Sequence, residues 1–220
     1  MSAKNPWTEE APSCIREARS CECNMSPRPP PDPLAQPQNT EAGLPGSTGK
    51  LGAFHPRLFA YDVLFGRVPP FVANRLRTQA LRAAGVSIGR ATIFWGTPKL
   101  YGRGPIAERL QIGTHCGFNE GCVFDLEESI TIGDHVAVGH DVLFLTRGSY
   151  PGTRERRAGP TRAAPVVIGP GTWLGSRCVV LPGVTIGASS VIGAGLVVSQ
   201  DIPENTLWTG GPSISLARWR

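Results

Sequence analysis

From residue 86 onward, the sequence repeats with a period of six residues. Each repeat opens with an aliphatic residue or phenylalanine, and glycine follows in most repeats. The repeats begin at Ile88, Phe94, Ile112, Phe118, Ile132, Val138, Ile168, Leu174, Val180, Ile186 and Ile192. A hexapeptide period is typical of a parallel β-helix, in which three short strands make one triangular coil. The sequence therefore predicts an all-β fold built from stacked coils.

The fifth position of these repeats carries a small or medium side chain. In a β-helix the lead residue points inward and stacks on the next coil, and the fifth residue points inward where the turn narrows. The fifth positions hold Thr92, Cys116, Cys122, Val136, Val142, Cys178 and Ser190. Three of the six cysteines are thereby predicted to be core residues without a redox or metal role.

Composition agrees with this fold and excludes several classes of protein. The 27 glycines and 21 prolines disfavour a helical bundle. No apolar run approaches the roughly 20 residues that span a bilayer, and the first residues lack the apolar region of a signal peptide. We therefore expect a cytoplasmic protein. Aromatic and basic residues do not interleave as they do in proteins that bind single-stranded nucleic acid, so no nucleic-acid partner is predicted.

Three parts are expected along the chain. Residues 1–50 are rich in proline and lack apolar periodicity, which predicts a disordered tail. Residues 51–85 are expected to form a helical cap, and residues 86–220 the β-helix. Within the cap, the pattern predicts helices over 57–66 and 70–84, the second starting near Pro70.

The second cap helix is predicted to be amphipathic. Its apolar face is expected to contain Phe71, Val72, Leu76, Ala80 and Leu81, and its basic face Arg75, Arg77 and Arg82. We expect the apolar face to pack on the β-helix. The alternative is that residues 57–82, which hold most of the excess positive charge, contact a membrane surface.

Two segments interrupt the repeat, at 101–110 and 147–165. The longer one is expected to be an excursion loop, since the repeat resumes directly after it. Residues 147–165 contain five arginines and one glutamate. A long insertion in a regular solenoid is usually functional.

The segment 173–203 (WLGSRCVVLPGVTIGASSVIGAGLVVSQDIP) carries a family resemblance. It resembles the hexapeptide-repeat acyltransferases, in the branch of maltose/galactoside and colanic-acid-type O-acetyltransferases, and the likeness covers about 57–218. The resemblance implies a left-handed β-helix, a homotrimer with active sites between subunits, and acetyl transfer from acetyl-CoA to a sugar hydroxyl. It also implies sugar binding by Asn119 and Asp125, and contacts of Trp173, Ser176 and Ala194 with coenzyme A.

The sequence differs from the family at a position that the resemblance implies lies near coenzyme A. A lysine that lies near the coenzyme A phosphates in relatives is Gln200 here. Guanidinium groups suit phosphates, so the loop residues Arg154, Arg156 and Arg157 are candidates to replace it.

The residue at the expected position of the general base also differs from the family. The position of the family histidine is occupied by Tyr150, and a phenol with a pKa near 10 is only about one part in a thousand ionised at pH 7. Arginines nearby in sequence would have to lower that pKa. The other candidate is His140 followed by Asp141, because an aspartate beside a histidine can orient the imidazole.

Several alternatives remain open from the sequence. The chain could be a catalytically inactive β-helix that binds a ligand or scaffolds a pathway, or an N-acyltransferase acting on an amino sugar. Histidines on a β-helix also resemble the γ-class carbonic anhydrases. His135 and His140 have that family's interval in the wrong phase, so no metal is predicted.

Overall fold

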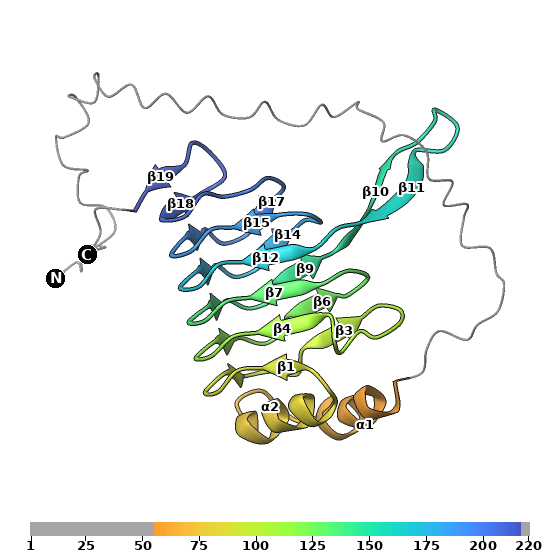
Figure 1. The fold of residues 1–220 in the computed structure, drawn as a ribbon, viewed down its shortest axis with the longest axis vertical. Helices are drawn as coiled ribbons and strands as arrows, with labels where there is room; N and C mark the ends of the chain where they lie inside the picture. The colour runs from red at the N-terminus through yellow and green to blue at the C-terminus, as the bar shows by residue number, and fades with distance from the viewer. Residues whose placement is uncertain (1–54, 217–220) are drawn as a thin grey trace, which may run out of the picture. The chain divides into compact units, whose positions relative to one another are not determined.

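The protein is described by a computed structural model that covers residues 55–216, with two helices followed by a parallel β-helix (Figure 1). The predicted disordered tail lies outside the described residues. Each coil adds one short strand to each of three sheets, which we name A, B and C. The predicted parallel β-helix with a short helical cap is confirmed.

The strands are two or three residues long, and equivalent strands of successive coils pair in parallel. Sheet A contains β1 (Ser87–Ile88), β4 (Leu110–Ile112), β7 (Ile130–Ile132), β12 (Val166–Ile168) and β15 (Thr185–Ile186). Sheet B contains β2 (Ile93–Phe94), β5 (Gly117–Phe118), β8 (Ala137–Val138), β13 (Trp173–Leu174), β16 (Val191–Ile192), β18 (Thr206–Trp208) and the antiparallel β19 (Ile214–Ser215). Sheet C contains β3 (Lys99–Tyr101), β6 (Val123–Asp125), β9 (Leu143–Leu145), β14 (Val179–Val180) and β17 (Val197–Val198).

The lead residues form the core, as predicted. All of them are buried except Ile88, which is half-buried in the first coil. The rings of Phe94 and Phe118 stack with centroids 4.5 Å apart, one coil above the other. Phe124 and Phe144 stack in the same way at 5.0 Å in sheet C. Stacking of like residues between coils is therefore the packing rule of this core.

The predicted inward position of the cysteines is also confirmed. Cys116, Cys122 and Cys178 are buried, and each thiol donates a hydrogen bond to a glycine carbonyl of the next coil. Burial raises the pKa of all three thiols, and raises that of Cys122 to about 12. A thiol that stays protonated is a poor nucleophile and metal ligand, so these cysteines act as packing residues.

The chain turns at three corners in each coil. We name them by the sheets that they join: the AB corner (89–92, 113–116, 133–136, 169–172 and 187–190), the BC corner (95–98, 119–122, 139–142, 175–178 and 193–196) and the CA corner (102–109, 126–129, 146–165 and 181–184). The CA corner is the irregular one. Eight residues separate the core residues Phe124 and Ile132, where a strict period would give six.

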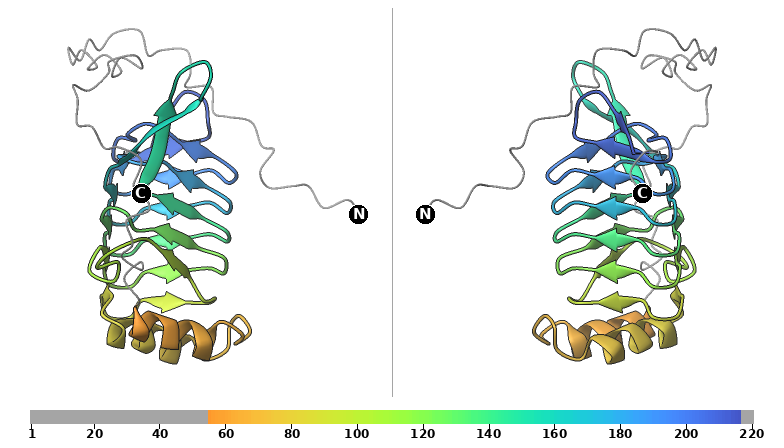
Figure 2. Two further views of the ribbon diagram at one scale, coloured as in Figure 1. Left: turned by 90° about the vertical axis from the view of Figure 1, so that its right-hand side faces the viewer. Right: turned by 90° about the vertical axis from the view of Figure 1, so that its left-hand side faces the viewer.

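The longer interruption is a hairpin rather than an irregular loop. Strands β10 (Arg147–Pro151) and β11 (Ala158–Ala163) pair in an antiparallel ladder. The hairpin stands out from the β-helix at the CA corner (Figures 1 and 2). Its turn carries Arg154, Arg156 and Arg157, which are all exposed.

The cap consists of α1 (Pro56–Phe65) and α2 (Asn74–Ala83), packed at the end of the β-helix where β1 and β2 begin (Figure 1). The prediction that the second helix starts near Pro70 is wrong. Phe71 and Ala73 have φ angles of 64° and 56°, which are incompatible with a right-handed helix. The helix therefore starts only at Asn74.

The predicted faces of the second helix are only partly right, since Leu81 is buried and Arg75 and Arg82 are exposed as predicted. Arg77, expected on the basic face, is 0% exposed, whereas Phe71 and Leu76, expected in the apolar interface, are 64% and 60% exposed. The reason is the hydrogen bonding of Arg77. Its guanidinium donates to backbone carbonyls of the first coil and of the segment before α2, so this side of the helix turns inward.

Candidate active site

Five of the predicted site residues lie on or beside the BC corner. Trp173 projects outward from sheet B and is 57% exposed. The other members are Asn119, His140, Ser176 and Ala194, each in the corner of one of four successive coils. The stacking of the coils thus gathers on one edge the residues that the sequence assigned separately to acceptor, base and donor.

Hydrogen bonds fix two of these residues. The backbone N–H of His140 donates to Oγ of Ser176 at 3.1 Å, and Nδ2 of Asn119 donates to the carbonyl of Val138 at 3.2 Å. His140 itself is exposed. The Ser176 hydroxyl therefore holds the turn that presents the imidazole.

Among the described residues, the Asp141 carboxylate makes no hydrogen bond to His140, so the pairing of these two side chains stays a prediction. The backbone of Asp141 is in the left-handed region, with φ of 55°, and its carboxylate pairs with Nε of Arg177 at 3.8 Å. The carboxylate lies between two coils, with Oδ2 toward Arg177 of the next coil and Oδ1 beside Gly121 of the preceding coil. Both partners of the ion pair are mostly exposed, so the pair contributes little to stability.

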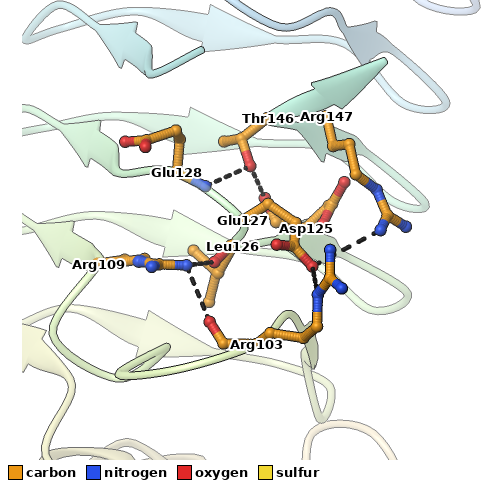
Figure 3. A network of polar contacts seen from close by, with 8 residues as sticks. All are labelled: Arg103, Arg109, Asp125, Leu126, Glu127, Glu128, Thr146 and Arg147. Atoms are coloured by element: carbon orange, nitrogen blue, oxygen red, sulfur yellow. Dashed lines mark hydrogen bonds and ion pairs between the residues drawn. The ribbon is translucent and has the colours of Figure 1, made fainter. Parts of the chain in front are cut away.

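The CA corner holds a second polar group, drawn in Figure 3. Nε of Arg103 lies 3.1 Å from Oε1 of Glu127, and a terminal nitrogen of Arg147 lies 3.6 Å from the same oxygen. The three residues come from successive coils, two positions after the paired residues Tyr101, Asp125 and Leu145. Glu127 therefore bridges the short excursion and the root of the hairpin.

Backbone contacts hold this corner in place (Figure 3). The buried hydroxyl of Thr146 donates to the carbonyl of Asp125 at 2.6 Å and accepts from the N–H of Glu128 at 3.0 Å. Arg109 donates to the carbonyls of Arg103 and Leu126 at 2.9 and 2.8 Å. Hydrogen bonds to the backbone therefore hold the turn from which the hairpin begins.

Asp125 lies half-buried beside this group. Burial raises the pKa of its carboxyl group, while the nearby Arg147 opposes that rise and Glu127 adds to it. Hydrogen bonds from the backbones of Arg147 and Glu127 favour the ionised form. The arrangement provides a carboxylate that can accept hydrogen bonds from a hydroxyl-rich ligand, next to exposed Tyr101.

Sequence reasoning missed Glu127, which is the carboxylate that both arginines contact. The available signal was the break in period between Phe124 and Ile132. Two extra residues at one corner of a regular coil require a widened turn, and that turn carries the acidic pair Glu127 and Glu128.

The candidate residues divide between two corners of one chain. Asn119 follows a strand of sheet B, whereas Asp125 ends a strand of sheet C. The donor candidates Ser176 and Ala194 belong to the BC corner, with Trp173 beside it in β13, and the hairpin arginines belong to the CA corner. The predicted site residues of one chain therefore lie at two separate corners.

The remaining histidines of the β-helix lie elsewhere. The rings of His115 and His135 stack at the AB corner with centroids 5.0 Å apart. Within residues 55–216, no group of three or more histidine, cysteine, aspartate or glutamate side chains could hold a metal ion.

The structural class of the protein is a parallel β-helix of hexapeptide coils with a hairpin at one corner. Residues 165–200 match the family described as bacterial transferase hexapeptide (six repeats). A galactoside acetyltransferase in complex with coenzyme A is 30% identical with a TM-score of 0.58, and the match covers 73% of this chain and 78% of that one. The chain belongs to the hexapeptide-repeat acyltransferase family.

Two further relatives bear on the site. A hexapeptide-repeat acetyltransferase from Vibrio cholerae O1 biovar eltor, solved with acetyl coenzyme A, is 28% identical with a TM-score of 0.61, covering 73% of this chain and 84% of that one. The galactoside O-acetyltransferase of Escherichia coli (strain K12) is 39% identical over 102 residues, which are 44% of this chain and 50% of the relative. The chain spans about half the length of the curated relatives it matches.

Proposed function

We propose that this protein is an acetyl-CoA-dependent O-acetyltransferase that acts on a sugar or a glycosylated small molecule. The observation that carries the proposal is the match with the coenzyme A-bound galactoside acetyltransferase along most of both chains. In the reaction, the acceptor hydroxyl oxygen bonds to the acetyl carbonyl carbon and the carbon–sulfur bond breaks. The hydroxyl proton passes to a base, and the coenzyme A thiolate leaves and is protonated.

The BC corner is the proposed donor side. The exposed indole of Trp173 offers a flat apolar surface. A β-carbon placed on Gly195, next to Ala194, would meet no atom within 4 Å, so the backbone there is open to a narrow, extended ligand. These features fit the pantetheine chain of coenzyme A, and His140 on the same edge is then near the thioester.

The CA corner is the proposed acceptor side. Asp125 would accept hydrogen bonds from sugar hydroxyls, and Asn119 would contribute its amide from the BC corner of another subunit. Glu127 holds Arg147 and Arg103, and so positions the hairpin root beside Asp125. Because one chain supplies two half-sites on different corners, a complete site requires a second copy.

The outer surface of the β-helix supports assembly into a homotrimer. The strands of sheet C present one charged residue outward, in the first coil, and then four apolar ones: Lys99, Val123, Leu143, Val179 and Val197. The outward residues of sheet B are also apolar: Ile93, Gly117, Ala137, Trp173, Val191 and Leu207. Those of sheet A are mostly polar: Ser87, Gln111, Thr131, Val167 and Thr185. An apolar outer column favours contact with a neighbour, so we propose that the trimer contacts involve sheets B and C and leave sheet A exposed.

Trimer formation is testable in solution. Light scattering should give a mass near three times the chain mass of 23.4 kDa. Val179→Asp should reduce that mass, because an unpaired charge at an apolar interface costs several kcal/mol. The matched control, Val167→Asp on sheet A, should remain trimeric. A wild-type monomer, or a trimer unaffected by Val179→Asp, contradicts the proposed assembly.

We also propose that the hairpin arginines of one subunit contact the phosphates of coenzyme A bound at the BC corner of another, and calorimetry with acetyl-CoA tests this contact. Replacing Arg154, Arg156 and Arg157 with alanine should weaken binding by at least about tenfold, since a hydrogen bond to a charged group is worth about 1.5–3 kcal/mol. The loss should be larger at low salt, where screening is weakest. Arg90→Ala, an exposed arginine of the first coil, should change affinity little. Unchanged affinity in the triple variant would show that the hairpin is a solvated arm.

A second candidate function rests on the residue that replaces the family histidine. With Tyr150 at that position, a β-helix that binds a ligand without transferring an acyl group accounts for the same fold. Binding of acetyl-CoA without turnover, across sugar and amino-sugar acceptors, would favour this alternative. Turnover on amino sugars alone would favour N-acylation.

A further inference from the structure

The outer surface of the cap is apolar over a continuous stretch of the chain. Six large apolar side chains of this segment are more than half exposed, and the rest of the described surface has only four others above half. They are Phe59 (57%), Val63 (58%), Leu64 (67%), Phe71 (64%), Val72 (52%) and Leu76 (60%). An exposed apolar patch of this kind marks an interaction surface.

The helix α1 carries apolar side chains on two sides. Leu58 and Tyr61 are buried on the side that faces the β-helix, while Val63 lies on the opposite side and is 58% exposed. A helix that is apolar on two sides is ordinarily buried on both, so the side that carries Val63 is a candidate contact surface.

Positive charge borders the apolar side chains. Residues 55–84 contain five arginines and a single acidic residue, Asp62. Arg77 is buried, and the guanidinium of Arg82 donates to the carbonyls of Ile88 and Gly89 in the first coil. Arg57, Arg67 and Arg75 are exposed. An apolar surface edged by arginines is complementary to a membrane interface, where acyl chains lie beneath anionic headgroups.

We propose that the outer face of the cap binds the surface of a membrane that contains anionic phospholipids. The apolar side chains would enter the boundary between headgroups and acyl chains, and the arginines would contact lipid phosphates. A second copy seated on the same face would bring arginines against arginines, which is unfavourable. Within residues 55–216, no helix is long and apolar enough to cross a membrane. The proposal does not rest on the acetyltransferase function.

The test is flotation of the full chain with vesicles of phosphatidylcholine, with and without phosphatidylglycerol. Binding should require phosphatidylglycerol and should decrease as salt is added. Leu64→Ser with Phe71→Ser should lower the partition coefficient by at least about tenfold for each side chain. Arg67→Ser with Arg75→Ser should lower it by about fivefold for each charge.

The matched control is Val167→Ser, which removes an exposed aliphatic side chain from sheet A and should float like the wild type. All these positions are exposed, so melting temperatures should stay near that of the wild type. The proposal is overturned if the wild type does not float with anionic vesicles, or if the Leu64/Phe71 variant floats equally well. It is also overturned if light scattering shows that the Leu64/Phe71 variant dissociates an assembly that the wild type forms. In that case the outer face of the cap is a contact between copies of the chain.

Discussion

Replacing His140 with alanine should slow acetyl transfer by about 10²–10⁴-fold, the usual contribution of a general base. His140 is the exposed imidazole on the edge that also carries Trp173, Ser176 and Ala194, and Ser176 fixes the backbone that presents it. The measurement is the steady-state rate with acetyl-CoA and a panel of sugar acceptors. Affinity for acetyl-CoA should change much less than the rate.

The pH profile distinguishes this base from the competing one. A rate that depends on an imidazole rises through about pH 6–7 and then levels off, because the imidazole loses its proton there. A rate that depends on a phenol keeps increasing above about pH 8. Tyr150→Phe should therefore leave both the rate and the profile nearly unchanged.

Two further variants act as controls. Asp141→Asn should have a small effect, because the Asp141 carboxylate pairs with Arg177. Tyr150→His introduces a histidine where the family resemblance implies one, and a large gain would mean that only the base had been lost from an otherwise complete site. If wild type, His140→Ala and Tyr150→His are all inactive with every acceptor, the protein binds rather than transfers.

The architecture was predictable because each coil repeats one local rule. The sequence shows the inward lead residue of each repeat, the small residue at the narrow turn and the glycine between them. The stacking of coils depends only on contacts between these repeated positions. The same rule placed the buried cysteines correctly. The rule failed at the CA corner, where two extra residues before Ile132 interrupt the six-residue period. The position of Glu127 could therefore not be assigned from the repeat.

The candidate site was less predictable, because adjacency in sequence differs from adjacency on a β-helix. His140 and Asp141 are neighbours in the chain, but the Asp141 carboxylate lies between Gly121 of the preceding coil and Arg177 of the next one. Residues far apart in sequence, such as Arg103, Glu127 and Arg147, instead meet in one column. The register between coils decides such contacts, and irregular corners shift that register.

In the cap, the helical periodicity of the sequence led to a partly wrong prediction of which side chains are buried. The alternation of apolar and basic residues in 70–84 fits a helix with Leu76 inside and Arg77 outside, and the structure has the reverse. A guanidinium can be buried when enough oxygen acceptors surround it. The acceptors for Arg77 are contributed by segments up to 20 residues away, so no local pattern reports them.

Arg77→Ala should lower the free energy of unfolding by about 3–5 kcal/mol, from the cavity and the unpaired carbonyls together. Nε donates to Oγ1 of Thr97 at 3.1 Å, and the terminal nitrogens donate to the carbonyls of Val68, Pro69, Phe94 and Trp95 at 3.3–3.4 Å. The side chain thus ties the segment before α2 to the first coil. Thermal unfolding followed by circular dichroism should show a melting temperature lower by about 10 °C or more.

Two substitutions separate the role of the guanidinium from that of charge and helix propensity. Arg75→Ala removes an exposed arginine from the same helix and should change stability by less than about 0.5 kcal/mol. Arg77→Lys keeps the charge, but one ammonium has three donors on a single nitrogen and cannot reach acceptors on both segments. We therefore expect Arg77→Lys to lose most of what Arg77→Ala loses. If Arg77→Ala melts with the wild type, the carbonyls have other donors and the cap is held by its apolar contacts alone.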